Sequence, residues 1–151
     1  MKIAAIVIRK GRQFESVSET APLAEAVQVM HRKKIGSVIV HNGSVSDVLG
    51  ILSQQELTCA IATHGTHALQ VPAAVFMRKP ALFCSCEDNA AQVMRVMTRE
   101  RSRHAIVRTA GAALAGVVSL GDLVAALLEE AQLEASVLRD MARSHLLALP
   151  G

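Results

Sequence analysis

The segment AEAVQVMHRKKIGSVIV, residues 24–40, decides the fold, because the chain repeats it as AQVMRVMTRERSRHAIV at residues 91–107. The two segments share the first alanine, a Val-Met pair, an arginine two residues later and a final Ile-Val pair. Downstream, VLGILSQQELTCAI matches LAGVVSLGDLVAAL at a spacing one residue shorter, which a single-residue loop deletion explains. Because internal repetition at a fixed spacing marks a fold built from copies of one unit, the body of the chain is two such copies.

Each copy predicts the same order of elements. Apolar residues recur at helical spacing at the start of a copy, as Leu23, Val27 and Met30 do in the first. Two short β-branched runs follow, separated by Gly, Asn, Asp and Ser, and this pattern predicts a hairpin-like pair of strands. Helical spacing then resumes. The unit is therefore a helix, two strands and a helix, preceded by a lead-in segment (AAIVIRK or AAVFMRK) that can add a strand.

One such unit has a one-sided sheet with too few strands to bury a core alone. Two units packed sheet to sheet can bury both faces, so we predict an α/β fold of two tandem repeats, each helix-strand-strand-helix with a lead-in strand segment. The predicted boundaries are residues 2–67 for the first repeat, 68–128 for the second and 129–151 for a C-terminal helical extension. The extension is an amphipathic helix with a narrow apolar stripe. Such a helix packs on its own body or on a partner subunit, and we favour a dimer contact over a membrane-surface role.

Composition narrows the classes of function. Apolar residues make up 51% of the chain and charged residues 19%, which is typical of a globular protein. The net charge is +3, with basic residues dispersed rather than gathered in one stripe, so it suits anionic small molecules better than nucleic acid. The chain has three Phe and no Trp or Tyr, which disfavours stacking of single-stranded bases.

Cysteine and histidine patterns give weak metal signals. Cys84 and Cys86 are too close together for the usual Cys-x-x-Cys zinc geometry, and HGTH at residues 64–67 has no acidic or thiol partner at metal spacing. We therefore expect no metal, and free thiols at these positions and at Cys59, as in a reducing cytoplasm. The N-terminal apolar run, residues 3–8, is too short for a secretory signal, and no stretch approaches the roughly 18 apolar residues of a membrane span. These features predict a soluble, cytoplasmic protein.

The repeat, the linker VPAAVFMRKP at residues 71–80 and the strand RSRHAIV at residues 101–107 resemble a known family. Together with two endings of the form Gly, two apolar residues, Ser-x-x-acid-Leu, they are similar to paired cystathionine-β-synthase (CBS) domains, also called a Bateman module. The resemblance covers about residues 2–128, and the chain looks like the short stand-alone bacterial members. It implies a module that binds adenine nucleotides such as AMP, ATP or NAD between the repeats and regulates an attached or partner protein. AMP is the nucleotide that we expect first.

The two Ser-x-x-acid endings are the first candidate site. In the family, the aspartate takes the ribose hydroxyls and the serine lies near ribose or phosphate, and Ser119 and Asp122 match this pattern. The first copy departs from it with Ser53 and Glu56. The longer glutamate is the better reciprocal capping residue, whereas aspartate is too short to reach back comfortably. We therefore expect the ribose site at Ser119 and Asp122 and a capping box at Ser53 and Glu56. The alternative that both pairs are only helix caps stays open.

Basic residues are the second set of candidates. Arg103 and His104 precede a strand where the first copy has Gly36 and Ser37, and a guanidinium there can form a two-pronged bond to phosphate. The alternative is a solvated basic turn. Gly36 either lets a phosphate approach the backbone or, as we favour, ends the preceding helix as its C-cap. Two further candidates lie in the equivalent lead-in segments: Lys10 and Arg78.

No catalytic motif accompanies these candidates: the sequence has no phosphate-binding Gly-rich loop, zinc signature or supported nucleophile–base pair. The leading hypothesis is a non-enzymatic, homodimeric adenine-nucleotide sensor that acts on a partner protein. The alternative is a ligand-free scaffold that works through protein–protein contacts.

Overall fold

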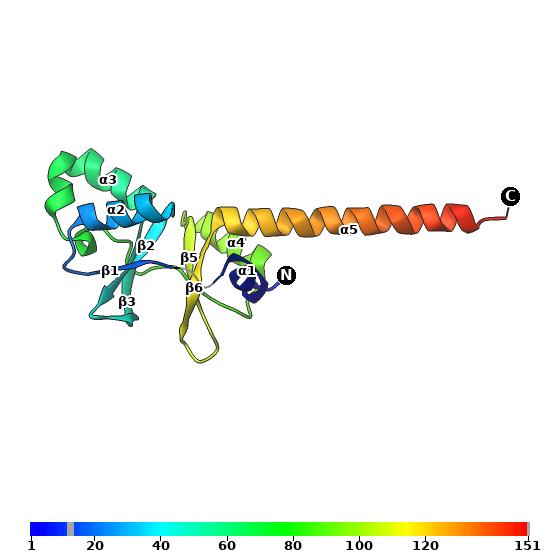
Figure 1. Cartoon of the computed structure of the whole chain (residues 1–151), viewed down its shortest axis with the longest axis horizontal. Helices are drawn as coiled ribbons and strands as arrows, with labels where there is room; N and C mark the ends of the chain where they lie inside the picture. The colour runs from blue at the N-terminus through cyan, green and yellow to red at the C-terminus, as the bar shows by residue number, and fades with distance from the viewer. Residues whose placement is uncertain (12–13, 151) are drawn as a thin grey trace.

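The computed structural model describes residues 1–11 and 14–150 and contains two three-stranded sheets of the same topology (Figure 1). In each sheet the first strand pairs parallel with the second, and the second pairs antiparallel with the third. The strands of the first sheet are β1 (Ser16–Ser18), β2 (Ser37–Asn42) and β3 (Ser44–Ser53). Those of the second sheet are β4 (Phe83–Ser85), β5 (His104–Arg108) and β6 (Leu114–Ser119).

Helices flank the sheets in the order that the repeat predicts. In the first repeat α2 (Leu23–Lys33) precedes β2, and α3 (Gln54–His64) follows β3. In the second repeat α4 (Ala90–Arg99) precedes β5, and α5 (Leu120–Ala148) follows β6. Two short 3-10 helices, η1 (Gly65–Gln70) and η2 (Ala73–Val75), form the connection between the repeats. The predicted unit of a helix, two strands and a helix is therefore confirmed.

The lead-in segments differ from the prediction. The first forms helix α1 (Ile3–Lys10) instead of a strand, and the strand added to the hairpin of each sheet, β1 or β4, comes from residues further along the chain. Ile3, Ile6 and Val7 are buried at helical spacing on one face of α1. The helix ends at Gly11, whose φ of 83° is a conformation that glycine adopts without strain.

Each lead-in segment packs on the other repeat. Helix α1 shares a hydrophobic core with residues of α4, β5, β6 and α5, and the backbone of Ile3 donates a hydrogen bond to the carbonyl of Asp88. The linker packs in the opposite sense, because Ala73 joins the core of the first repeat and donates to the carbonyl of Ala21. The two repeats are thus tied together by both lead-in segments.

A third apolar cluster joins the two sheets. Ile39 and Ile51 of the first sheet lie in one buried cluster with Ile106 and Val117 of the second, and Ala81 completes it. Ile39 is paired with Ile51 across β2 and β3, and Ile106 with Val117 across β5 and β6. The predicted packing of sheet against sheet is confirmed.

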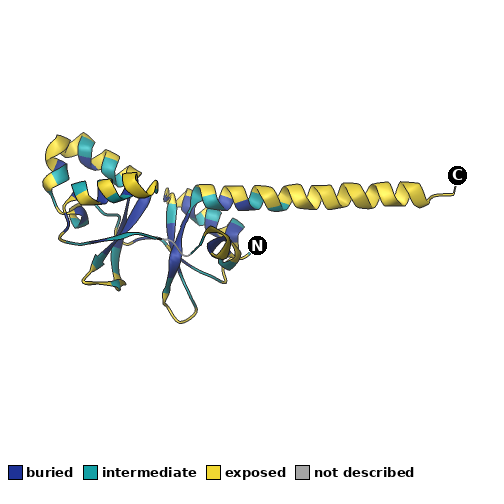
Figure 2. Cartoon of the chain, in the orientation of Figure 1, coloured by how far each residue is buried: buried dark blue, intermediate teal, exposed yellow. Residues whose placement is uncertain are grey.

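Helix α5 is one continuous helix that leaves the body of the protein. Its first turns bury Leu123 and Ala126, whereas residues 131–150 are all exposed and project away from both sheets (Figure 2). The predicted extension is thus helical, as expected, but it does not pack on its own body. None of the helices in the described part of the chain combines the length and the apolar character that a membrane span requires.

Candidate functional site

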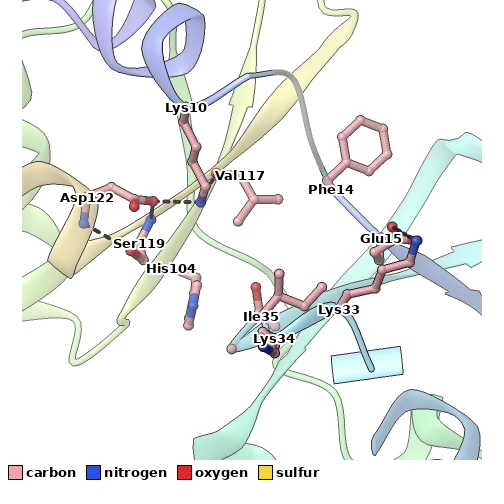
Figure 3. A pocket seen from close by; sticks show the side chains of 12 residues that line it. Lys10, Phe14, Glu15, Lys33, Lys34, Ile35, His104, Val117, Ser119 and Asp122 are labelled. Carbon is pink, nitrogen blue, oxygen red and sulfur yellow. Dashed lines mark hydrogen bonds and ion pairs between the residues drawn. The ribbon is translucent and has the colours of Figure 1, made fainter. Parts of the chain in front are cut away.

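A cavity of about 610 Å³ lies between the two repeats (Figure 3). Its size is within the usual range for small-molecule sites. The first repeat lines it with Phe14, Glu15, Lys33, Lys34, Ile35, Gly36 and Ser37. The second repeat contributes His104, Val117, Ser119 and Asp122, and Lys10 reaches it from the end of α1. Six of the ten candidate residues therefore line one cavity, although they come from segments more than 100 residues apart.

Ser119 and Asp122 form a complete capping box at the start of α5. The Ser119 N–H donates to Oδ2 of Asp122 at 2.8 Å, and the Asp122 N–H donates to Oγ of Ser119 at 3.0 Å. The expectation that aspartate is too short for this role is wrong. Ser119 is extended, with φ −96° and ψ 159°, and the aspartate reaches its N–H. Ser119 and Asp122 therefore both cap α5 and line the cavity.

Ser53 and Glu56 form the predicted capping box at the start of α3. The Ser53 N–H donates to Oε2 of Glu56 at 2.8 Å, the Ser53 hydroxyl donates to the same oxygen, and the Gln55 N–H donates to Oγ of Ser53 at 3.2 Å. Glu56 does not line the first cavity; it lines a separate shallow hollow beside α3. Its carboxylate is folded back on the serine.

Lys10 holds the carboxylate of Asp122. Its Nζ lies 2.7 Å from Oδ2 of Asp122 and 3.2 Å from the carbonyl oxygen of Val117 (Figure 3). Burial raises the pKa of Asp122, but the hydrogen bonds from Lys10 and Ser119 outweigh it and hold the pKa below its usual value. Asp122 is therefore an ionised acceptor at neutral pH. The lysine beside it comes from a different segment of the chain.

His104 stands between two cavities. It lines the first cavity and also a second one of about 580 Å³, and its Nδ1 is buried with no hydrogen-bond partner among the described residues. Burial, reinforced by the nearby Lys10, lowers the pKa of His104. A Cβ placed on Gly36 would lie 3.3 Å from Nε2 of His104, so the imidazole packs closely against this glycine. Gly36 is not the C-cap of α2, because Lys34 takes the left-handed position at φ 55°.

Arg103 lines the second cavity, together with Ser53, and not the cavity of Asp122. Arg103 and Asp122 therefore line different cavities in this structure. Arg103 and His104 are adjacent at the start of β5, and successive side chains of an extended segment point to opposite sides.

Arg78 lies in neither cavity. Its guanidinium donates to the carbonyls of Glu100 at 2.7 Å and Arg101 at 3.2 Å, at the C-terminal end of α4. A cation there stabilises the unsatisfied carbonyls and the negative end of the helix dipole. The Arg78 side chain therefore ties the linker to the second repeat.

Sequence reasoning missed the lysines of the first cavity, Lys33 and Lys34. The basic run at the end of α2 was the signal in the sequence, but only the fold shows that these lysines face the cavity. In the part of the chain that the structure describes, no three His, Cys, Asp or Glu side chains are grouped as metal ligands.

Comparison with protein families gives two matches to the CBS domain, at residues 7–63 and 73–129. The chain belongs to the CBS-domain family. A crystal structure of a CBS-domain protein from Agrobacterium tumefaciens is 34% identical, with a TM-score of 0.77, covering 83% of this chain and 97% of that chain. This tandem CBS protein thus has a relative of nearly the same extent. A comparison with curated proteins finds no match.

Two further solved structures share the fold of this CBS protein and contain nucleotides. One, from Pyrobaculum aerophilum, is complexed with AMP; it is 23% identical, with a TM-score of 0.73, and covers 87% of this chain and 99% of that chain. The other is the CBS domain of a bacterial CNNM/CorC family Mg²⁺ transporter in complex with ATP, 18% identical, with a TM-score of 0.67 over 82% and 84% of the two chains.

Proposed function

We propose that this CBS protein is a regulatory module that binds an adenine nucleotide in the cavity lined by Asp122 and Lys10. The single observation that carries the proposal is this ion pair, which faces a cavity bounded by both repeats. The AMP and ATP complexes of proteins with the same fold support the choice of ligand class. AMP is the first candidate, and ATP and NAD are the others.

Asp122 and Ser119 supply the chemistry for a ribose. The carboxylate of Asp122 is ionised and uses one oxygen, Oδ2, for Ser119 and Lys10. Its Oδ1 accepts no hydrogen bond from the described residues and is available for a hydroxyl. Hydrogen bonds between a charged acceptor and a hydroxyl each contribute about 1.5–3 kcal/mol. Ser119 lies at the cavity wall beside it. We assign the ribose hydroxyls to Asp122 on this basis.

Lysines supply the chemistry for a phosphate. The cavity is lined by Lys10, Lys33 and Lys34. The Nζ of Lys33 lies 3.7 Å from Oε1 of Glu15. A phosphate competes with Asp122 for the ammonium of Lys10. When the phosphate binds this ammonium, the Asp122 carboxylate loses that partner and can accept a further hydrogen bond from the ribose. A nucleotide should therefore bind more tightly than the nucleoside that lacks the phosphate.

Binding in this cavity can regulate because the ligand touches both repeats. A ligand shifts a conformational equilibrium only when it binds two arrangements with different affinity. Residues of the first repeat, Gly36 and Ser37, and of the second, Ser119 and Asp122, line the same cavity. A change in their separation is the shift that a regulated partner protein would sense, and no catalytic step is part of this proposal.

Isothermal titration calorimetry with AMP, ATP and NAD tests the ligand and the site. Asp122→Asn keeps the size of the side chain and an acceptor for the cap, and we expect it to weaken nucleotide binding at least about tenfold, the value of one charged hydrogen bond. Glu56→Gln is the matched control, because Glu56 lies outside the cavity, and it should leave the affinity unchanged. No binding of any of the three nucleotides, or equal effects of the two variants, would contradict the proposal.

Lys10→Met tests the phosphate. We expect this variant to bind AMP and adenosine with similar affinity, because the group that distinguishes them is gone. Lys79→Met is the control and removes the same charge. Lys79 holds the equivalent lead-in position but lines neither cavity. The idea fails if Lys10→Met still prefers AMP as strongly as the unmodified protein does.

The exposed part of α5 favours a second candidate, a ligand-free scaffold that acts through protein contacts. It predicts an unchanged melting temperature at millimolar nucleotide, whereas a ligand that binds only the folded protein raises the melting temperature further as its concentration rises above the dissociation constant.

A further inference from the structure

The second cavity, of about 580 Å³, is lined by two arginines and by no carboxylate: its charged residues are Arg101 and Arg103. The neighbouring Arg99 is paired with Glu100. In the part of the chain that the structure describes, neither Arg101 nor Arg103 has a side-chain hydrogen bond or an ion pair, and both are exposed. Two unpaired cations on one cavity repel each other, and an anion between them removes this repulsion.

The turn after α4 sets the direction of both arginines. Arg101 takes a left-handed conformation, with φ 53°, and its carbonyl accepts a hydrogen bond of 3.2 Å from Arg78. Ser102, the residue between the arginines, is 5% exposed, and its hydroxyl donates to the carbonyl of His104 at 2.8 Å. Because the buried Ser102 is fixed between them, the two arginines lie on the open side of this turn and line the cavity together.

The second cavity offers little to a ribose. Glu56, the equivalent of the ribose acceptor proposed in the first cavity, does not line it and is folded back on the cap of α3. The hydroxyls that line the second cavity are all engaged as donors within the protein: those of Ser53, Thr58 and Thr98. The charged donors that remain are the two guanidinium groups, whose planar geometry matches the oxygens of a phosphate.

The balance of charge differs between the two cavities. Three lysines and two carboxylates line the first, a formal charge of +1, whereas the second has +2. His104 counts as neutral in both, because its pKa is lowered by burial. A phosphate monoester carries roughly −1.5 to −2 at neutral pH, so AMP in the first cavity leaves the two arginines without a counter-charge. Further phosphates supply it. The two cavities share His104, whose buried Nδ1 has no partner among the described residues.

We propose that the second cavity is a phosphate site, in which Arg101 and Arg103 bind the terminal phosphates of a nucleotide whose ribose lies at Asp122 in the first cavity. The inference rests on the proposed function for the source of the phosphate, and it narrows the ligand class to nucleoside di- and triphosphates such as ATP. A free polyphosphate presents the same groups to the same arginines and is the other source.

Calorimetric titration of the full chain with ATP, AMP and inorganic tripolyphosphate, without Mg²⁺, tests the site. We expect the unmodified chain to bind ATP at least about tenfold more tightly than AMP, and Arg103→Met to remove this preference, since about tenfold is the value of one charged hydrogen bond. The affinity of Arg103→Met for AMP should change by less than about twofold. Arg99→Met is the matched control: it removes the same charge beside the cavity, lines neither cavity and should change neither affinity. Circular dichroism verifies that each variant is folded.

Tripolyphosphate has no ribose, so it separates the two sources of phosphate and the two proposals. If it binds through Arg103 while ATP binds no more tightly than AMP, the phosphate enters the second cavity as a free anion, and the site stands. If neither AMP nor ATP binds but tripolyphosphate binds through Arg103, the proposed function fails and the phosphate site stands. Unchanged affinities of Arg103→Met for both ATP and tripolyphosphate overturn the phosphate site and leave the binding of AMP at Asp122 unaffected.

Discussion

The two sheets of this protein present equivalent edges that are closed in different ways. In the first repeat, Ile51 and Arg78 exchange backbone hydrogen bonds of 3.2 and 2.8 Å, so the linker seals the edge of β3. In the second repeat, the equivalent residue of β6 is Val117, whose carbonyl accepts from the side chain of Lys10. A backbone pair is fixed by the course of the chain, whereas a lysine side chain can swing to another acceptor. The edge of β6, beside the proposed nucleotide cavity, is therefore closed by the more easily displaced contact of the two.

Glycines under the two lead-in segments provide the largest test of this difference. A Cβ on Gly50 would lie 2.5 Å from the carbonyl oxygen of Arg78 and 2.8 Å from the sulfur of Met77, whereas one on Gly116 would meet only Val7, at 3.6 Å. We expect Gly50→Ala to lower the free energy of unfolding by about 3 kcal/mol, through overpacking against backbone. Gly116→Ala should lower it by less, about 1 kcal/mol, through backbone strain at its φ of 159° and not through a contact. Urea denaturation measures both. Equal losses would show that the two edges are equally tight.

The capping serines give a smaller effect that separates fold from ligand. Ser53→Ala and Ser119→Ala each remove a side-chain acceptor for a helix N–H, and each should lower the free energy of unfolding by about 1 kcal/mol. Only Ser119→Ala should also weaken nucleotide binding, because Ser119 lines the cavity of Asp122 and Ser53 lines the other one. Calorimetric titration of both variants checks this. If Ser53→Ala weakens binding more, the nucleotide occupies the second cavity.

The repeat made the architecture predictable, because it fixes the order of elements and requires two one-sided sheets to cover each other. The pairing of α1 with the second repeat was not predictable from local sequence, since a short run rich in isoleucine and valine fits a strand as well as a helix. Ile3, Ile6 and Val7 become helical against a core supplied by residues from Cys84 onward in the second repeat. The cavity lining was partly predictable. Ser119, Asp122 and His104 were candidates from the sequence. The cavity that Arg103 lines depends on the alternation of side chains along the strand. The position of the Arg78 side chain depends on the carbonyls at the end of α4.

His104 lines both cavities. Lowering the pH tests its protonation and has the smallest expected effect of these predictions. Burial lowers the pKa of His104, and Lys10 and Arg103 add to this effect against the opposite influence of Glu56 and Asp122. A folded-state pKa below the ordinary 6.5 means that the unfolded chain binds the proton more readily, so stability falls as the pH drops below about 6.5. We expect His104→Gln to remove up to about 1 kcal/mol of the loss measured between pH 7 and 5.5. Urea denaturation at the two pH values gives this difference. An unchanged loss in His104→Gln would mean that the imidazole takes up its proton while the protein stays folded, and that the wall between the two cavities is open to water.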